Sequence, residues 1–458
     1  MVGPKSSRRP ERRPGNSAAL VETAVSGFFA PRLSRGGGCV CVGLSGGMDS
    51  VVLLHALCGV MPRLGAATRL EAVHVHHGLS PHAGAWADFC IQLCNGLAVP
   101  VEVVRVQVPR DTGEGLEAAA RRLRHGVFAA CGADWLALAH HRDDQAETML
   151  LNLLRGAGVA GAAGMLDERP QARGPALVRP LLDVPRAAIE AYAEAHGLRW
   201  IDDESNADRH FRRNFLRHEI FPRLEVSFPG AGRSLARAAR HFAAATTLLD
   251  DLAEIDRKAV ATPSGRLALA AVNALPRERA RNLLRHVWQR AGFQAPDTAW
   301  IDEALAQLAT ADTLSEVCVA TAEGELHVYR GEVHVLPLRR LPASGPLAWS
   351  GQACMPWAGG RVRFLESTGQ GLNRALLAGA GVSLAPRQGG ERLQPDARRP
   401  RRTLRNLLQE GGVPPWERPR LPFLWVDGRL AWVGGIGVDV AFACPDGEAG
   451  ILPVWEKD

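Results

Sequence analysis

Lysine is almost absent from this chain of 458 residues, where it occurs only at Lys5, Lys258 and Lys457. Two of the three lie near the termini and Lys258 lies in a polar stretch, so none is a good nucleophile for a Schiff base or a lysyl-AMP intermediate. Arginine therefore carries nearly all the positive charge, and the formal net charge is +6. Such a composition suits a polyanionic partner or merely reflects a GC-rich genome, and composition does not separate the two.

The sequence also lacks the signatures of several protein classes. The nine cysteines form no CxxC pair, which argues against a structural zinc site and indicates a reduced, cytoplasmic protein. No apolar run reaches membrane-spanning length, and residues 1–16 are basic and proline-rich without the apolar segment of a secretory signal. The motif GxxxxGK[ST] is missing, which excludes a Walker-type γ-phosphate hydrolase. We expect no membrane association and no obligate protein partner.

Strands and helices alternate over residues 39–229. The β-rich runs CVCVGL, LEAVHVHHG, VEVVRVQV and WLALAHH are each followed by a segment of helical or loop-then-helix character. This alternation predicts an α/β domain with a doubly wound parallel sheet. The remaining expectations are a basic, disordered tail at 1–38, a helical domain at 230–336 and, after a proline-rich linker, a small α/β domain at 348–458.

The first predicted strand runs into a glycine-rich loop, SGGMDS, and then directly into a helix. Glycine amides at a helix N-terminus form an anion site, because no side chain keeps a phosphate away. A carboxylate repels phosphate unless a metal ion lies between them, so Asp49 predicts Mg²⁺ beside bound ATP. A capped helix start is the simpler alternative, but the full string in this context favours ATP binding. The predicted ATP-binding residues are Ser45, Gly46, Gly47, Met48, Asp49 and Ser50.

The loop resembles the SGGxDS signature of the PP-loop ATP pyrophosphatases, which have an adenine nucleotide alpha hydrolase-like fold and transfer AMP to an oxygen. The blocks HVHHGLSPHAGAWADFC, AHHRDDQAETMLLNLLRGAG and WIDDESNADRHFRRNFLR, and the C-terminal RQGGERLQPDARRPRRTLRNLLQEGGVPPWERPRLPFLW, are similar to successive blocks of the tRNA(Ile)-lysidine synthetase family. The resemblance covers nearly everything after residue 38. It implies a ligase that adenylates the C2 oxygen of the first anticodon cytidine in the CAU isoleucine tRNA. Free L-lysine then displaces AMP, which switches the tRNA from methionine to isoleucine.

The resemblance also implies roles for single residues. Asp144 and Glu147 are three residues apart at the start of a helix. Negative side chains are common there because they interact favourably with the helix dipole, and this is the ordinary interpretation. The resemblance instead favours a pocket that binds the ammonium group of lysine. Arg121, in EAAARRLR, matches an arginine that faces the active site of the family, so we expect it to be catalytic with Asp49. Asp49 or a neighbouring carboxylate would deprotonate the lysine amine. His140 is expected to contact the nucleotide.

The resemblance further implies that the domains at 230–336 and 348–458 bind tRNA. Two groups of arginines are expected to contact it. Arg213, in the block RRNFLR, is expected to hold RNA or phosphate. A second group abuts an apolar, turn-rich block, which suits contact with the tRNA backbone, although a solvated loop is the ordinary alternative. This group is Arg398, Arg399, Arg401, Arg402 and Arg405. Two rivals stay open: a PP-loop thiolase, against which the missing cysteine pairs count, and a tRNA-binding protein without catalysis, against which the intact loop counts.

Overall fold

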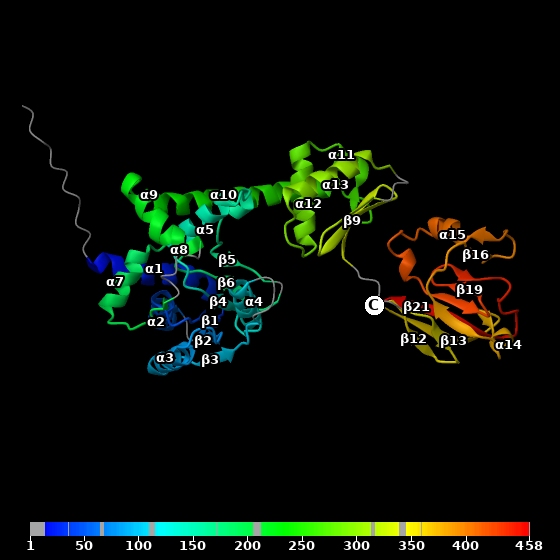
Figure 1. The fold of residues 1–458 in the computed structure, drawn as a ribbon, viewed down its shortest axis with the longest axis horizontal. Helices are drawn as coiled ribbons and strands as arrows, with labels where there is room; N and C mark the ends of the chain where they lie inside the picture. Colours follow the sequence, from blue (N-terminus) through cyan, green and yellow to red (C-terminus); the bar gives the residue numbers. More distant parts are fainter. Residues whose placement is uncertain are drawn as a thin grey trace, which may run out of the picture. The chain divides into compact units, whose positions relative to one another are not determined.

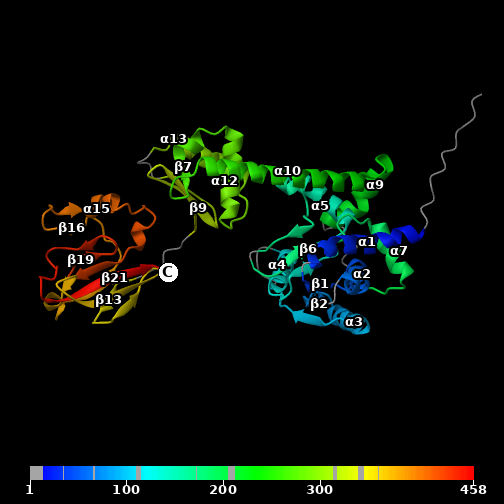
Figure 2. The same cartoon turned by 180° about the vertical axis from the view of Figure 1, so that it is seen from behind.

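The computed structural model describes residues 14–34, 36–64, 68–109, 115–171, 173–204, 212–312, 317–338, 345–358 and 360–457. The chain divides into two compact units, Met1–Leu249 and Asp250–Asp458, and each is described by itself. Figures 1 and 2 show the elements of both units from opposite sides. Among the described residues, no helix combines the length and the apolar character needed to cross a membrane.

The first unit is built on a six-stranded sheet in the order β3-β2-β1-β4-β6-β5. All neighbouring strands pair in parallel except β5, which is antiparallel to β6. The chain steps outward from β1 in both directions, so β1 lies at a topological switch point, where ligand crevices form in such sheets. The doubly wound parallel sheet is thus confirmed. The strands are β1 (Gly38–Gly43), β2 (Thr68–His76), β3 (Val101–Arg105), β4 (Trp135–Ala137), β5 (Glu168–Arg169) and β6 (Ala176–Val178).

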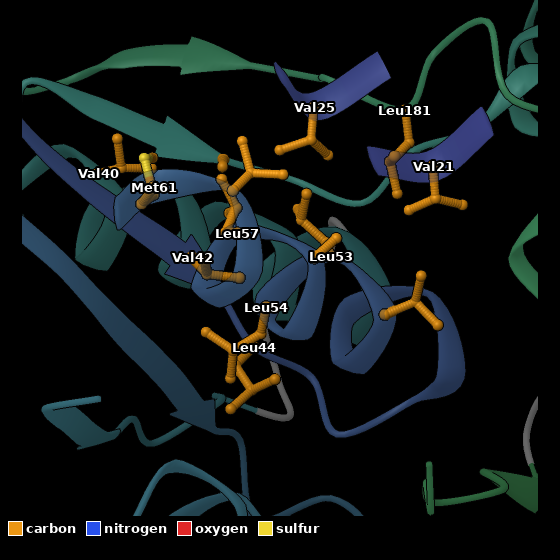
Figure 3. Close-up of a cluster of buried hydrophobic side chains, with 14 of the residues drawn as sticks. Val21, Val25, Val40, Val42, Leu44, Leu53, Leu54, Leu57, Met61 and Leu181 are labelled. Atoms are coloured by element: carbon orange, nitrogen blue, oxygen red, sulfur yellow. The ribbon is translucent and has the colours of Figure 1, made fainter. Parts of the chain in front are cut away.

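Helices connect and cover these strands. The helix after β1 is the most buried of them, and its apolar side chains pack with the central strand into one large core, part of which Figure 3 shows. The helices after β1 are α2 (Met48–Leu64), α3 (Ala83–Gly96), α4 (Leu116–Ala129), α5 (Arg142–Leu154), α6 (Val159–Ala162) and α7 (Arg186–Ala195). A broken helical segment follows: α8 (Arg212–Phe215), a π-helix (Leu216–Ile220), α9 (Phe221–Ser227) and α10 (Ala231–Ala259).

A helix near the N-terminus corrects one prediction. Residues Pro14–Leu33 form α1, which packs on α2 and α7 (Figures 1 and 2). Val21, Val25 and Phe29 are fully buried, and Figure 3 shows the first two in the same cluster as residues of α2. The prediction of a disordered tail over 1–38 is therefore wrong for residues 14–33, because side chains four apart bury one face of a helix. Residues 1–13 lie outside the described part.

The second unit begins with helices and then becomes rich in strands. Its first part has the predicted helices α11 (Leu269–Asn273), α12 (Arg277–Arg290) and α13 (Thr298–Thr310). It also has a four-stranded antiparallel sheet that the prediction of a helical domain did not include. The buried residues of these strands, which alternate with exposed ones in Val317–Ala320, share one core with the helices. The strands are β7 (Leu267–Ala268), β8 (Val317–Ala320), β9 (Gly324–Tyr329) and β10 (Glu332–Pro337).

The C-terminal part of this unit has two main sheets and two short helices, α14 (Arg374–Leu377) and α15 (Leu404–Glu410). One sheet has the order β11-β15-β18-β19-β20 and the other β12-β13-β21-β14, with a two-stranded ribbon β16-β17 beside them. The strands are β11 (Leu347–Trp349), β12 (Cys354–Pro356), β13 (Gly360–Thr368), β14 (Leu372–Asn373), β15 (Val382–Ala385), β16 (Arg392–Leu393), β17 (Arg402–Thr403), β18 (Phe423–Val426), β19 (Arg429–Val433), β20 (Gly437–Val438) and β21 (Ala449–Lys457).

Candidate active site

The loop between β1 and α2 lies at the carboxyl end of the central strand. Gly46 has φ +88°, a left-handed conformation that favours glycine, and its carbonyl accepts a hydrogen bond from the Ile201 amide at 3.0 Å. The Ser50 hydroxyl donates to the Gly47 carbonyl at 2.9 Å, and the Gly47 amide donates to the Ser45 hydroxyl at 3.3 Å. Hydrogen bonds within the loop therefore hold its shape. The predicted ATP-binding residues lie together at the start of α2, and their role stays a prediction.

Asp49 is the acidic residue of this loop. Its Oδ1 is buried and has no hydrogen-bond partner among the described residues, while Oδ2 lies 3.8 Å from His141 Nε2. Burial raises the pKa of Asp49, and Asp144 adds to the rise, whereas His141 opposes it. A buried carboxylate oxygen without a donor is an atom that a cation satisfies, and Mg²⁺ prefers oxygen ligands. The donor set of the loop therefore fits a magnesium ion beside a phosphate group.

His141 joins this loop to the start of α5. Its Nδ1 accepts from the Asp144 amide at 3.4 Å, and its own amide donates to Asp144 Oδ2 at 3.1 Å, so the two residues cap the helix reciprocally. With Nδ1 as the acceptor, Nε2 carries the proton and lies 3.4 Å from Asp144 and 3.8 Å from Asp49. Sequence reasoning singled out the neighbouring His140 and missed His141. The sequence feature that could have identified His141 is its position directly between a strand and the acidic start of a helix.

The two carboxylates predicted to bind lysine lie side by side and are almost fully buried. Asp144 is 7% exposed and Glu147 is 3% exposed. Although burial opposes the charged form of Asp144, His141 and Arg213 hold its pKa below the ordinary value. The Asp144 carboxylate caps the helix, as the ordinary reading expected, but it also faces Glu147 across a shared pair of cations. The site is therefore a built anionic pair.

Arg213 and Arg217 supply those cations. Arg213 Nη2 donates to Asp144 at 2.8 Å and its Nε donates to Glu147 at 2.9 Å. Arg217 Nε donates to Glu147 at 2.7 Å, and its Nη2 donates to both carboxylates at 3.0 and 2.9 Å. These hydrogen bonds hold the pKa of Arg217 above its ordinary value despite burial. Arg213, which was predicted to bind tRNA or phosphate, thus contacts the predicted lysine pocket. Arg217 was not predicted from the sequence.

His140 and Arg179 form a second group beside the acidic helix start. Arg179 Nε donates to His140 Nδ1 at 3.3 Å, and burial lowers the pKa of His140 to about 3, so the ring is neutral. Burial and the nearby Arg169 and Arg121 lower the pKa of Arg179 to about 10. Arg121 itself is exposed on α4 and adds positive charge here. Its catalytic role and the contact of His140 with nucleotide stay predictions.

The predicted arginine cluster of the C-terminal part divides into two kinds. Arg401 is paired with the fully buried Asp439 at 2.6 Å, and Arg402 donates to Glu410 at 2.7 Å. These two side chains are engaged in holding the ribbon in place. The remaining three, Arg398, Arg399 and Arg405, are exposed, and Arg399 Nε lies 3.7 Å from the exposed carboxylate of Asp396.

Comparisons with known proteins match the whole architecture. Family models match a PP-loop domain over residues 19–224, a TilS substrate binding domain over 267–334 and a TilS substrate C-terminal domain over 382–455. The tRNA(Ile)-lysidine synthase of Azoarcus sp. strain BH72 is 45% identical over 423 residues, which cover 91% of each chain. That of Aromatoleum aromaticum is 47% identical over 94% of this chain and 100% of the relative, and that of Nitrosomonas europaea is 40% identical over 96% and 97%. The chain belongs to the tRNA(Ile)-lysidine synthase family.

Proposed function

We propose that this protein joins free L-lysine to C2 of the cytidine at the first anticodon position of a CAU-anticodon isoleucine tRNA, at the expense of ATP. The family membership and the PP-loop domain support an ATP-dependent, tRNA-modifying ligase. The observation that carries the proposal is the buried pair Asp144 and Glu147. It is linked through His141 to Asp49 of the phosphate loop. An ammonium group held at that pair would lie next to the site where AMP is transferred.

Different residues of the loop would have different roles in the first half-reaction. The amides of Gly46 and Gly47 and the hydroxyls of Ser45 and Ser50 would bind the ATP phosphates at the N-terminus of α2. Asp49 would hold Mg²⁺, which supplies positive charge against the phosphates. Transfer of AMP to the C2 oxygen of the cytidine releases pyrophosphate and turns that oxygen into a leaving group.

The second half-reaction needs an amine without its proton. Asp144 and Glu147 would bind free lysine as an ammonium, and Asp49 or a neighbouring carboxylate would accept the proton. The neutral amine then attacks C2, and AMP leaves. The positive group around Arg121 and Arg179 would stabilise the negative charge that develops on the departing phosphate.

The tRNA would be held mainly by backbone contacts. Arg398, Arg399 and Arg405 present exposed guanidinium groups on the C-terminal part, which suits phosphate contacts that carry no sequence information. The target cytidine lies in an anticodon loop, where a base is presented unpaired. The cytoplasmic location predicted from the cysteines stays a prediction.

Product analysis tests this proposal. The protein is incubated with ATP, Mg²⁺, lysine and an unmodified isoleucine tRNA transcript, and the nucleosides of the digested tRNA are separated by mass spectrometry. We expect the anticodon cytidine to gain the mass of a lysyl residue, with AMP and pyrophosphate formed in equal amounts. AMP formation without any lysine adduct would reject the lysine ligase.

A further inference from the structure

The predicted lysine pocket is filled by the chain itself. Five hydrogen bonds between 2.7 and 3.0 Å join the guanidinium groups of Arg213 and Arg217 to the carboxylates of Asp144 and Glu147. Two positive charges therefore neutralise two negative charges at the place where the ammonium of lysine would bind. A further cation would find no free carboxylate there, so binding of lysine requires that a guanidinium group leaves.

The arginines are placed so that they can leave while the carboxylates stay. The side chains of Arg213 and Arg217 are 36% and 26% exposed, whereas those of Asp144 and Glu147 are only 10% and 4% exposed. The guanidinium groups thus lie on the solvent side of the pair. Removal of both without a replacement would leave two buried carboxylates unpaired, which is costly. Exchange for another cation avoids that cost.

The segment that carries the arginines has few buried residues. Neither α8 nor α9 has a buried residue, and Leu216 is the one residue of the intervening π-helix that is buried. π-helical turns are rare and are frequently found at functional sites. Segments with few buried apolar contacts open at low cost in free energy. The short helices from α8 to α9 therefore have the properties of an element that moves during a binding cycle.

Phosphate is the natural second partner for these guanidinium groups. Contacts connect these groups to the phosphate loop: Arg217 donates to Asp144 at 3.0 Å, and His141 Nε2 lies 3.4 Å from Asp144 and 3.8 Å from Asp49. Guanidinium groups bind phosphate and carboxylate with the same two-pronged geometry. A nucleotide in the loop or a tRNA backbone beside it would therefore compete with the carboxylates for the arginines.

We propose that Arg213 and Arg217 are positioning residues that occupy the lysine pocket until lysine displaces them, and that bound phosphate assists this exchange. The inference rests on the proposed function, because it requires Asp144 and Glu147 to bind lysine. Since coupling between two ligands is reciprocal, a phosphate ligand would tighten lysine binding and lysine would tighten binding of that ligand. The enzyme would then hold lysine firmly only when a phosphate-bearing substrate is present.

Titration calorimetry of lysine into the full-length protein tests the exchange. We expect Arg217→Gln and the double variant Arg213→Gln/Arg217→Gln to bind lysine more tightly than the unaltered protein, on the order of tenfold. Arg212→Gln is the matched control. It removes one positive charge from the same helical segment, but Arg212 is exposed and is not among the described partners of either carboxylate. We expect its dissociation constant for lysine to be unchanged. A merely structural role for Arg217 predicts the opposite sign, weaker binding.

Further variants distinguish failure of the exchange from failure of the proposed lysine pocket. Weaker lysine binding in the folded Arg217→Gln variant, together with loss of binding in Glu147→Gln, would overturn the exchange and leave the lysine pocket intact. Unchanged lysine binding in Glu147→Gln would instead reject the lysine pocket of the proposed function. If Arg217→Gln does not fold, Arg217→Met keeps the length of the side chain without its charge, and we expect tighter binding there too.

The unaltered protein supplies an independent test. We expect a non-hydrolysable ATP analogue and an unmodified tRNA transcript, each added alone, to show which of the two phosphate sources lowers the dissociation constant for lysine. The absence of any change with either source would overturn the phosphate-assisted part of the inference.

Discussion

Alanine substitutions at the two adjacent glycines of the phosphate loop separate folding from ATP binding. At Gly46 the backbone has φ +88°, and an added Cβ would lie 2.5 Å from Ile201 Cδ1. The left-handed conformation costs an alanine about 1–2 kcal/mol, and forcing Ile201 from its rotamer costs roughly 0.5–1.5 kcal/mol more. We expect Gly46→Ala to destabilise the first unit by about 2–3 kcal/mol, which lowers its thermal midpoint by roughly 5–10 °C.

Gly47→Ala is the matched control, with the opposite pattern. An added Cβ there would meet Ser45 Oγ at 3.5 Å and the Ile201 carbonyl at 3.9 Å, which are ordinary contacts. Only the preference for glycine over alanine at a helix N-cap remains, about 0.5–1 kcal/mol. The methyl group would nonetheless obstruct a phosphate. Loss of one charge-assisted hydrogen bond, about 1.5–3 kcal/mol, corresponds to roughly 10- to 100-fold weaker ATP binding.

Differential scanning fluorimetry and calorimetric titration with a non-hydrolysable ATP analogue measure the two effects. The reasoning is refuted if Gly46→Ala keeps the midpoint of the unaltered protein. It is also refuted if Gly47→Ala binds the analogue as tightly as the unaltered protein does, because the amides of this loop would then not face the phosphates.

Three further predictions concern the acidic groups and His140. Asp49→Ala is expected to abolish AMP transfer, measured as pyrophosphate release, while tRNA binding in a gel-shift assay is largely kept; equal loss of both would contradict this division. Asp144→Ala combined with Glu147→Ala is expected to raise the KM for lysine strongly, and an unchanged KM would return these carboxylates to helix capping alone. His140 has a pKa lowered from 6.5 to about 3 in the folded protein. Its contribution to stability is therefore complete above pH 6.5 and is lost as the pH falls toward 3, because the unfolded chain takes up a proton that the folded one does not. At pH 5 this loss amounts to about 2 kcal/mol. Denaturant titrations should show that His140→Gln loses less stability between pH 7 and pH 5 than the unaltered protein, and equal losses would count against the buried neutral ring.

Much of the first unit could be predicted from local pattern. Alternating strands and helices indicate a parallel sheet, and a glycine loop between the first strand and helix indicates the switch point. The helix α1 was missed although Val21, Val25 and Phe29 are spaced four apart, because the basic, proline-rich residues before them dominated the interpretation. The sheet β7-β10-β9-β8 was missed because helical segments lie between its first strand and the other three in the chain.

The arrangement of the acidic pocket could not be predicted in the same way. Arg213 lies 66 residues from Glu147 in the chain, and Arg217 lies 70 residues from it. A motif indicates that an arginine is near the site, but the side to which its guanidinium group points depends on how α8 and the π-helix pack on α5. The same holds for Arg401, whose buried partner Asp439 lies on a distant loop.

Incorporation of radiolabelled lysine into tRNA tests the central claim most directly. The protein is incubated with ATP, Mg²⁺ and an unmodified CAU-anticodon isoleucine tRNA transcript, with a methionine tRNA transcript of the same anticodon as the control. We predict that label enters the isoleucine transcript and not the methionine transcript. Pyrophosphate release without label in the isoleucine transcript would contradict the account, because the adenylated cytidine would then react with a nucleophile other than lysine.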